Sequence, residues 1–375
     1  MNPNDMDKVF GGVYGGKRVL VTGHTGFKGA WLTLWLIKMG AEVAGFSKYL
    51  PSDPCLFDVL GLKRKIRHYQ GDVVNYAHVE KVFKTFKPQV VFHLAAQPIV
   101  RTSYEDPKRT FDTNVGGTVN VLECIRRSQG VRAAVMITSD KCYENIGTTR
   151  GYCEDDRLGG EDPYSASKGC AEIVFSAYFR SFYAHQDKIA AATTRAGNVI
   201  GGGDWAKDRI VPDCARAWSQ GKKAVIRNPQ ATRPWQHVLE PLSGYLWLGA
   251  CLLQGRPKIA GESFNFGPRQ RASKTVGQLA DLFVSLWDGA SWEHVPVVGR
   301  KKEALLLQLS PRKTQQMLAW SAALSFRETV TFTALWYRQY YAGRENMFDL
   351  SCAQIDAYIQ KARANGAPWA GKGNV

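Results

Sequence analysis

The sequence predicts an α/β fold, in which a doubly wound parallel sheet carries a smaller mixed α/β lobe toward the C-terminus. Three observations predict it. Short apolar runs of strand length alternate with helical patterns over the first half of the chain, and the first run leads directly into a glycine-rich turn and a helix. The chain of 375 residues is long enough for a large domain with a second lobe. Such alternation favours parallel strands with helices on both faces.

The first strand is expected at 17–22, and a helix is expected to continue from the turn through Met39. Between them lies the sequence GHTGFKGA, at 23–30. Glycines allow a tight turn, and the start of the helix offers free N–H groups to a pyrophosphate. A strand, a glycine turn and a helix in this order are typical of a Rossmann-type dinucleotide site, although the GxxGxxG spacing also fits an ordinary strand-to-helix turn. The predicted cofactor contacts here are Gly23, Thr25, Gly26, Phe27, Lys28 and Gly29.

Two further strands are expected, at 42–47 and 66–70. The second strand of an NAD site normally ends in an acid that binds the ribose 2′-hydroxyl. Here Ser47 and Lys48 end the strand and no acid precedes Asp53. NAD and NADP both remain open, because Lys48 would tolerate a 2′-phosphate. Asp72, followed by Val73, is expected to meet the adenine; the alternative is an exposed turn aspartate.

The next elements are a helix at 76–86, a strand at 89–96, a helix at 111–128 and a strand at 133–138. His93 lies inside an apolar strand, where a hydrogen-bonded core histidine is a better interpretation than a ligand. Small side chains after it would let the backbone pass close to a cofactor. The predicted cofactor contacts in this part are Leu94, Ala95, Ala96 and Asn114. Gln97, in the turn after the strand, is assigned to the substrate.

One stretch, between the fifth strand and the following helix, carries the candidate chemistry. Ser139, Asp140 and Lys141 place a hydroxyl, an acid and an amine at a strand end, where open α/β sheets bind their ligands. A proline suits the first position of the helix, and Tyr164 and Lys168 share one helical face. A free tyrosine, with a pKa near ~10, is a poor base at neutrality, but a neighbouring ammonium lowers that pKa. The predicted catalytic residues are Ser139, Asp140, Lys141, Tyr164 and Lys168.

This helix is expected to continue through residue 182, and a strand at 189–194 then leads into a glycine-rich loop that crosses into the lobe. Four arginines and two tryptophans follow. Arginine forks suit a diphosphate, and aromatic rings suit a base or a sugar face. The alternative is a solvated basic surface with core tryptophans. These six residues are Arg209, Arg216, Arg227, Arg233, Trp218 and Trp235, and the predicted substrate contacts are Gln97, Asn198, Arg209 and Arg233.

The predicted organisation has three parts. Residues 1–16 form a loose leader, residues 17–197 form the NAD-binding domain with a later return near 235–262, and residues 198–375 form mainly the sugar-nucleotide lobe. A last strand and turn are expected at 263–268, followed by mostly helical chain. Residues 368–375 are expected to be frayed.

The formal charge of +16 suits anionic partners, from sugar nucleotides to nucleic acid. Lys and Arg are scattered, however, and no basic heptad helix, zinc-finger spacing or RNP-type motif occurs, so nucleic acid is not expected as a partner. None of the eight cysteines forms a CxxC pair, which favours a reduced, cytoplasmic chain without a metal site. No apolar segment suits a secretory signal, and the longest apolar run, 242–253, is too short to span a bilayer, so no membrane is expected.

Four motifs together resemble the extended short-chain dehydrogenase/reductase family, over roughly residues 17–345. They are the glycine turn at 23–29, HLAA at 93–96, YSASK at 164–168 and RAGN at 195–198. Longer stretches resemble one branch, the CDP-glucose 4,6-dehydratases, at 23–32, 93–107, 138–145, 195–213 and 233–248. The related dTDP-glucose dehydratases carry Asp-Glu where this chain has Asp140 and Lys141, so Lys141 separates the chain from them.

The resemblance implies a reaction on CDP-glucose, with a tightly bound NAD that is regenerated in each cycle. Tyr164 takes the proton from the C4 hydroxyl while hydride passes to NAD, Lys168 lowers the tyrosine pKa and holds the cofactor ribose, and Ser139 hydrogen-bonds the C4 oxygen. Lys141, alone or with Asp140, removes the C5 proton, and Asp140 protonates the departing C6 hydroxyl. Hydride return to C6 gives CDP-4-keto-6-deoxyglucose. Because a protonated lysine is no base, this needs a protonated Asp140 beside a neutral Lys141.

Two other functions stay open on the sequence: an epimerase or reductase acting on a sugar nucleotide, and a non-catalytic nucleotide-binding protein. Loss of Tyr164 or Lys168 would have favoured the latter, and both are present. The resemblance further implies a bacterial cytoplasmic enzyme that supplies 3,6-dideoxyhexoses for surface polysaccharide such as O-antigen. It also implies a homodimer, or a tetramer, through the helices near 107–128 and 163–182.

Overall fold

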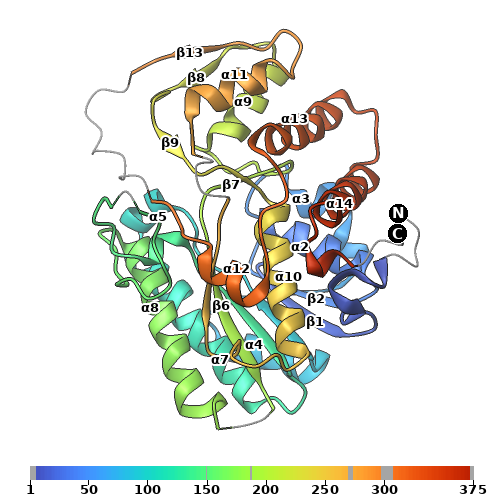
Figure 1. The fold of residues 1–375 in the computed structure, drawn as a ribbon, viewed down its shortest axis with the longest axis vertical. Helices are drawn as coiled ribbons and strands as arrows, with labels where there is room; N and C mark the ends of the chain where they lie inside the picture. The colour runs from blue at the N-terminus through green and yellow to red at the C-terminus, as the bar shows by residue number, and fades with distance from the viewer. Residues whose placement is uncertain (1–5, 149, 186–187, 269–272, 297–306, 372–375) are drawn as a thin grey trace.

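The computed structural model describes residues 6–148, 150–185, 188–268, 273–296 and 307–371. It confirms the predicted fold class. Seven strands form one sheet in the order β11-β6-β5-β4-β1-β2-β3, and each neighbouring pair is parallel (Figure 1). The strands are β1 (Arg18–Thr22), β2 (Glu42–Ser47), β3 (Arg67–Gln70), β4 (Val90–His93), β5 (Ala133–Ile137), β6 (Ala190–Ala196) and β11 (Ser263–Phe266).

Helices cover both faces of this sheet. One face carries α2 (Phe27–Lys38), α10 (Leu239–Leu253) and α14 (Met347–Ala364), and the other carries α4 (Tyr76–Phe86), α7 (Gly117–Arg127) and α8 (Pro163–Tyr178). Successive side chains of a strand point to opposite faces. Accordingly, Val19 and Val21 of β1 lie in the core with α2 and α10, whereas Leu20 lies in the core with α4 and α7.

The order of the strands creates a crevice. β1 pairs with β2 on one side and with β4 on the other, so the direction in which the chain adds strands reverses between β1 and β4. Open α/β sheets bind their ligands at such a switch point, beyond the carboxyl ends of the strands. We therefore expect the site at the ends of β1, β4 and β5.

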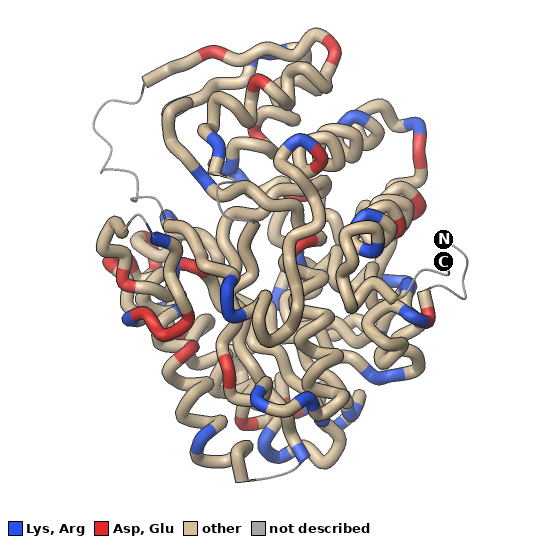
Figure 2. The backbone as a smooth tube through the Cα atoms, viewed as in Figure 1, with Lys and Arg blue, Asp and Glu red and all other residues tan. Residues whose placement is uncertain are grey.

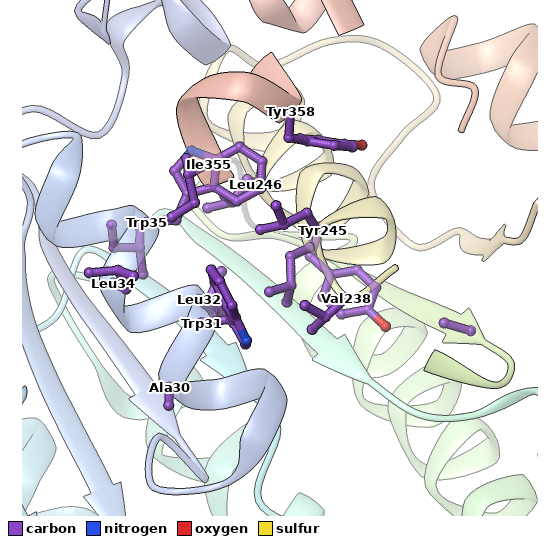
Figure 3. Close-up of a cluster of buried hydrophobic side chains, with 14 of the residues drawn as sticks. Ala30, Trp31, Leu32, Leu34, Trp35, Val238, Tyr245, Leu246, Ile355 and Tyr358 are labelled. Atoms are coloured by element: carbon purple, nitrogen blue, oxygen red, sulfur yellow. The ribbon is translucent and has the colours of Figure 1, made fainter. Parts of the chain in front are cut away.

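The apolar run at 242–253 lies in α10, a helix whose residues from Leu239 to Leu252 are all buried. α10 packs against β5, β6 and α2. Figure 3 shows this apolar contact, with Trp31 and Trp35 of α2 near Leu246 of α10, and Ile355 of α14 above them. No helix within the described residues is long and apolar enough to cross a membrane.

A mixed α/β lobe lies beyond the crevice, as predicted (Figure 1). It contains α9 (Ile210–Ser219), α11 (Val276–Val284), β8 (Ala224–Ile226), β9 (Thr232–Arg233), β12 (Lys274–Thr275), β13 (Trp292–His294) and the adjoining α13 (Phe326–Ala342). β13 runs parallel to β8, and β12 runs antiparallel to β9. Two short strands, β7 (Val199–Ile200) and β10 (Gln236–His237), connect the lobe to the sheet domain. The C-terminal part of the chain contributes to the sheet domain as well as to the lobe, because α10, β11 and α14 pack on the sheet domain.

Shorter elements complete the chain. They are α3 (Leu56–Val59), α5 (Val100–Glu105), α6 (Pro107–Phe111), α12 (Arg312–Leu318), the 3₁₀ turns η1 (Val9–Gly12), η2 (Leu62–Arg64), η4 (Asp140–Cys142) and η6 (Pro368–Ala370), and the π-helical turns η3 (Asp112–Gly116) and η5 (Phe179–Tyr183). The helix expected at 111–128 is thus the end of α6, a π-helical turn and α7.

Both chain ends depart from the expectation. The predicted loose leader is wrong for residues 6–16, because Phe10 is fully buried and the Tyr14 hydroxyl donates to the Leu246 carbonyl at 2.6 Å. The predicted fraying is wrong for residues 368–371, because the buried Trp369 stacks on Phe10 with ring centroids 5.0 Å apart. Isolated aromatic side chains anchor both ends, and they form no periodic pattern in the sequence. Residues 1–5 and 372–375 lie outside the described residues.

Charged residues are spread over the molecule. Figure 2 shows Lys and Arg on both the sheet domain and the lobe, interspersed with Asp and Glu. The positive net charge therefore does not gather into one stripe in this view, which agrees with the scattered basic residues of the sequence.

Candidate active site

A cavity of about 1030 Å³ lies over the carboxyl ends of β1, β4 and β5. This volume is at the upper end of the range for small-molecule sites, which suits two ligands side by side. The sheet domain forms one wall, and the lobe forms the other. The predicted site residues that line the cavity are Gly23, Thr25, Gly26, Phe27, Lys28, Gly29, Asp72, Val73, Leu94, Ala95, Ala96, Gln97, Ser139, Asp140, Lys141, Tyr164, Lys168, Asn198, Arg209 and Arg233.

The glycine turn between β1 and α2 forms one end of the cavity. Gly23 has a φ of +74°, and a Cβ there would lie 2.7 Å from the backbone nitrogen of Ala95. A Cβ at Gly29 would overlap the Gly23 carbonyl. In the described structure no side chain caps the start of α2 at Gly26, so its first N–H groups are available to an anion. This cradle fits the diphosphate of a dinucleotide.

Asp72 lies beyond β3 and is held by two cations. Arg109 donates to its carboxylate, and the Lys48 ammonium lies 3.1 Å from it. Burial alone would raise the pKa of Asp72, but hydrogen bonds from Arg109, the Val74 N–H and Lys48 bring that pKa below its ordinary value. Asp72 is therefore an ionised, paired residue of the cavity wall rather than an exposed turn aspartate. Arg109 was not predicted, because only the fold brings α6 to the end of β3.

His93 is a core histidine, as the sequence predicts. Its Nδ1 lies 2.7 Å from the Thr22 hydroxyl, and its Nε2 lies 3.3 Å from the Thr118 hydroxyl. Burial, helped by the charge of Lys168, lowers the pKa of His93 to about 3. The ring is therefore neutral at neutral pH.

Asn114 is absent from the described residues that line the cavity. Its Oδ1 accepts from the Gln97 N–H at 2.8 Å, and its Nδ2 donates to the Ser167 hydroxyl at 2.8 Å. The Gln97 side chain in turn accepts from the Ile99 N–H at 2.6 Å. Asn114 therefore supports the wall that Gln97 and α8 form. It does not line the cavity, so the predicted direct contact with the cofactor is wrong.

The predicted catalytic side chains converge. Ser139, at the end of β5, donates to Asp140 Oδ1 at 2.9 Å and makes a hydrogen bond with the Tyr164 hydroxyl. Asp140 and Lys141 belong to the short turn η4, which packs against α8. Pro163 begins α8, as predicted, and Tyr164 and Lys168 are both buried on its inner face. A hydroxyl, a carboxyl, an amine and a phenol thus surround one region of the cavity.

Burial dominates the proton affinities of this cluster. It raises the pKa of Tyr164 to about 12, and the hydrogen bond to Ser139 only partly opposes it. The expectation of a lowered tyrosine pKa is therefore wrong for the protein by itself. Burial also lowers the pKa of Lys168 to about 8 and raises the pKa of Asp140.

Lys28 joins this cluster from the first turn of α2. Burial lowers its pKa to about 8; the nearby Asp140 opposes this, and Arg209 and Lys168 add to it. From the sequence, Lys28 is assigned to the cofactor. The structure brings its ammonium into the field of Asp140 and Lys168, beside the Tyr245 ring at 6.0 Å from the centroid.

Of the four arginines that follow the glycine-rich loop, the two assigned to the substrate line the cavity. Arg209 lines it and pairs with Asp204 at 2.7 Å, and Arg233 and Trp235 line it from β9 and the segment after it. Arg216 and Arg227 instead pair with Asp213 and Asp208, and Trp218 packs in the lobe core. For these three residues the alternative of a basic surface with core tryptophans is therefore correct. Within the described residues, no group of His, Cys, Asp or Glu could hold a metal ion.

Two residues behind the catalytic cluster were missed. Glu172 and Arg195 form an ion pair of 2.9 Å, with side chains only 2% and 3% exposed. A signal for Glu172 exists in the sequence, since it follows Lys168 by four residues and so shares its helical face. Arg195 lies in β6 and begins the RAGN motif, but the motif itself assigns it no role in the site.

Comparison with known proteins decides the family. A sequence profile of the GDP-mannose 4,6 dehydratase family matches residues 20–333. The chain belongs to this family. Over 353 residues it is 45% identical to the CDP-glucose 4,6-dehydratase of Salmonella typhimurium (strain LT2), and the match covers 92% of this chain and 96% of that protein. A probable dTDP-glucose 4,6-dehydratase of Sinorhizobium fredii is 27% identical, with 85% of this chain and 92% of that protein covered.

Solved structures share the fold of this 4,6-dehydratase family member. A dTDP-glucose 4,6-dehydratase of Streptomyces venezuelae with NAD and TYD bound superposes with a TM-score of 0.74 at 24% identity, covering 88% of this chain and 99% of that one. The UDP-glucose 4-epimerase of Thermotoga maritima gives a TM-score of 0.74 at 23% identity, covering 86% and 99%. The seven-stranded sheet with its lobe is thus common to dehydratases and epimerases.

Proposed function

We propose that this protein is a hydro-lyase that converts CDP-D-glucose to CDP-4-keto-6-deoxy-D-glucose and water. One observation carries the proposal: the phenol of Tyr164, the hydroxyl of Ser139 and the acid–amine pair of Asp140 and Lys141 meet in one cavity that also contains a glycine cradle. The 45% identity to a CDP-glucose 4,6-dehydratase over most of both chains supports the same reaction.

We infer that the cradle holds NAD. NAD held there would supply the hydride acceptor for C4 and the hydride donor for C6, with no net redox change. Gly23, Gly26 and Gly29 would hold the diphosphate, and Asp72 and Val73 would border the adenine. NAD is favoured over NADP because Lys48, which would have paired with a 2′-phosphate, is already paired with Asp72. Because the cofactor is regenerated, we expect tight binding.

Tyr164 is the proposed base for the C4 hydroxyl. In the protein by itself its phenol is protonated at neutral pH, with a pKa of about 12. When the sugar binds, the Ser139 hydroxyl would turn from Asp140 and donate its single proton to the C4 oxygen. Lys168, buried on the same helical face, supplies the positive charge that favours the phenolate when it forms.

Asp140 and Lys141 are proposed to carry out the elimination. Burial raises the pKa of Asp140, so this carboxyl is suited to hold a proton and give it to the departing C6 hydroxyl. Lys141 lines the cavity from the neighbouring position and would remove the C5 proton, which the C4 ketone acidifies. Asp140 is buried and Ser139 fixes its Oδ1 at 2.9 Å, so the acid is held in place before the substrate binds.

The experiment that tests this function presents the purified protein with NAD and, separately, CDP-, dTDP-, UDP- and GDP-hexoses. A 4-keto-6-deoxy product from CDP-glucose, formed at least about tenfold faster than from the others, is the expected result. A 4-epimer, or net formation of NADH, would instead identify an epimerase or a dehydrogenase. Absence of any product with all four would leave a nucleotide-binding protein.

We further propose a cytoplasmic homodimer that supplies 3,6-dideoxyhexoses for surface polysaccharide. The exposed apolar side chains Phe111, Ile173 and Phe182 support the dimer, because they lie on or directly beside α6 and α8, where the partner's helices would cover them. Replacement of Ile173, which is 58% exposed, by Lys should give a monomer in sedimentation experiments. An unchanged sedimentation coefficient would place the interface elsewhere.

A further inference from the structure

A buried carboxylate lies one helical turn beyond Lys168. Glu172 follows Lys168 by four residues in α8, and side chains at this spacing are neighbours on a helix. The Glu172 carboxylate accepts hydrogen bonds from Thr193 Oγ1 at 2.7 Å, Ser263 Oγ at 3.0 Å and the Thr138 hydroxyl. These three donors fix its position from the residue after β5, from β6 and from β11.

Arg195 completes the charge balance. Its Nη2 donates to Glu172 at 2.9 Å. Its Nη1 donates at 2.6 Å to the hydroxyl of Tyr143, the residue that follows η4. The Tyr143 hydroxyl in turn donates to Asn265 Oδ1 at 2.9 Å. A buried ion pair gains little net stability from its own attraction, because two charges leave water. The Glu172–Arg195 pair therefore adds little stability of its own, and its carboxylate lies one helical turn from Lys168.

Lys168 sits in a pocket that otherwise disfavours its charge. Burial lowers the pKa of its ammonium to about 8, and Glu172, followed by Cys142, acts against that shift. The ammonium of Lys28 lies in its field from α2, and the neutral ring of His93 faces it from β4. The charged or titratable groups that act on Lys168 are Glu172 on α8, Cys142 on η4, Lys28 on α2 and His93 on β4, and Tyr164 shares its helical face.

We propose that Glu172 is a positioning residue for the reaction: held by Arg195 and three hydroxyls, its carboxylate lies one helical turn from Lys168 and keeps the Lys168 ammonium charged. The proposal rests on the function proposed above for Tyr164 and Lys168. Glu172 touches no substrate, since it lies behind the cavity wall. It acts through Lys168, whose charge favours the tyrosine phenolate. Without Glu172, Lys168 loses its proton at lower pH, and deprotonation of the C4 hydroxyl slows.

The test measures C4 oxidation in a single turnover, from the absorbance of reduced cofactor, between pH 6 and 10. Three proteins are compared: wild type, Glu172→Gln and the double variant Glu172→Gln/Arg195→Met. The rate should fall at high pH, where Lys168 loses its proton; we call this fall the alkaline limb of the profile. We expect it to move to lower pH by about one unit in both variants. The single variant should also lose thermal stability, because Arg195 is left buried without its partner. The double variant should regain part of that stability and keep the shifted limb.

The matched control is Glu262→Gln, which makes the same charge change in an ion pair with Lys313 that lies outside the cavity. Its pH profile should match that of wild type. A double variant whose rate falls at the same alkaline pH as in wild type would overturn the proposal, whatever its stability, since the pair would then have no effect on Lys168.

A second measurement separates failure of this proposal from failure of the proposed function. NMR titration of ¹³C-labelled lysine side chains gives the pKa of Lys168 directly, with the signal assigned by its loss in Lys168→Met. This pKa should fall by about one unit in the double variant whether or not CDP-glucose is the substrate. An unchanged Lys168 pKa would refute the role of Glu172, whereas a shifted pKa without turnover of CDP-glucose would refute only the proposed reaction.

Discussion

Gly197→Ala is the substitution with which the structure tests the acid role of Asp140 most selectively. Gly197 lines the cavity after β6, and a Cβ there would lie 3.1 Å from Asp140 Oδ2. The backbone of Gly197 is not in the left-handed region, so the added methyl group causes no backbone strain. Ordinary carbon–oxygen contacts begin near 3.4 Å. The carboxylate must therefore move by about 0.3–0.5 Å.

The size of the effect follows from this displacement. A misplacement of about 1 Å at a reacting group costs roughly 10²-fold in rate. On the same logarithmic scale, 0.3–0.5 Å corresponds to a loss of about four- to tenfold. The loss should fall on the elimination step, in which Asp140 is proposed to give its proton, and not on C4 oxidation, which Tyr164 is proposed to begin. Reduced cofactor should therefore accumulate during turnover.

The assay follows reduced cofactor by its absorbance and the release of 4-keto-6-deoxy product in the same stopped-flow experiment. Gly116→Ala is the matched control, because a Cβ at Gly116 meets nothing within 4 Å. It should leave both rates within about twofold of wild type. Equal slowing of both steps in Gly197→Ala, or no slowing of either, would refute the assignment of Asp140 to the elimination.

Four further predictions follow from the same structure. Lys141→Met should leave C4 oxidation intact but stop exchange of the C5 hydrogen with deuterated solvent, and undiminished exchange would remove Lys141 from the role of base. Tyr164→Phe should slow C4 oxidation by about 10²- to 10⁴-fold in single-turnover experiments, and a loss below about tenfold would contradict its role as base. Burial lowers the pKa of His237 to about 3, so the unfolded chain binds a proton below pH 6.5 that the folded chain does not, and stability falls as pH falls from 6.5 toward 3. His237→Asn should flatten the dependence of unfolding free energy on pH by up to about 1.4 kcal/mol per unit, measured by urea unfolding from pH 7 to 4, whereas an unchanged slope would mean that His237 is protonated in the folded state. Trp369→Ala should cost about 3–5 kcal/mol of unfolding free energy, since the fully buried ring stacks on Phe10; a loss under 1 kcal/mol would show that the chain end is not anchored.

Local patterns predict the sheet and the glycine turn because both follow from short-range physical constraints. The run before Gly23 is strand-like in itself, and the positive φ of Gly23 needs a glycine wherever the chain goes next. The spacing of Tyr164 and Lys168 likewise fixes their common face on any helix. Such features need no knowledge of distant residues.

The remaining features depend on contacts between distant segments. Arg109 reaches Asp72 across 37 positions, and Phe10 stacks on Trp369 near the other end of the chain. The pKa of Tyr164 depends on burial more than on its neighbours in sequence, which is why the sequence argument gave the wrong direction for the free protein. Arg209 and Arg233, the two arginines assigned to the substrate, line the cavity, whereas the role of Arg216 and Arg227 stayed open because a sequence does not show which arginines have carboxylate partners.

The most direct test of the account follows one hydrogen atom through the reaction. The protein, with NAD, would convert CDP-glucose that carries deuterium at C4, and the product would be examined by NMR. The account predicts that the deuterium appears at C6 of CDP-4-keto-6-deoxyglucose while C5 takes its hydrogen from solvent. Deuterium that stays at C4 in a 4-epimer, or that is lost to water, would contradict it.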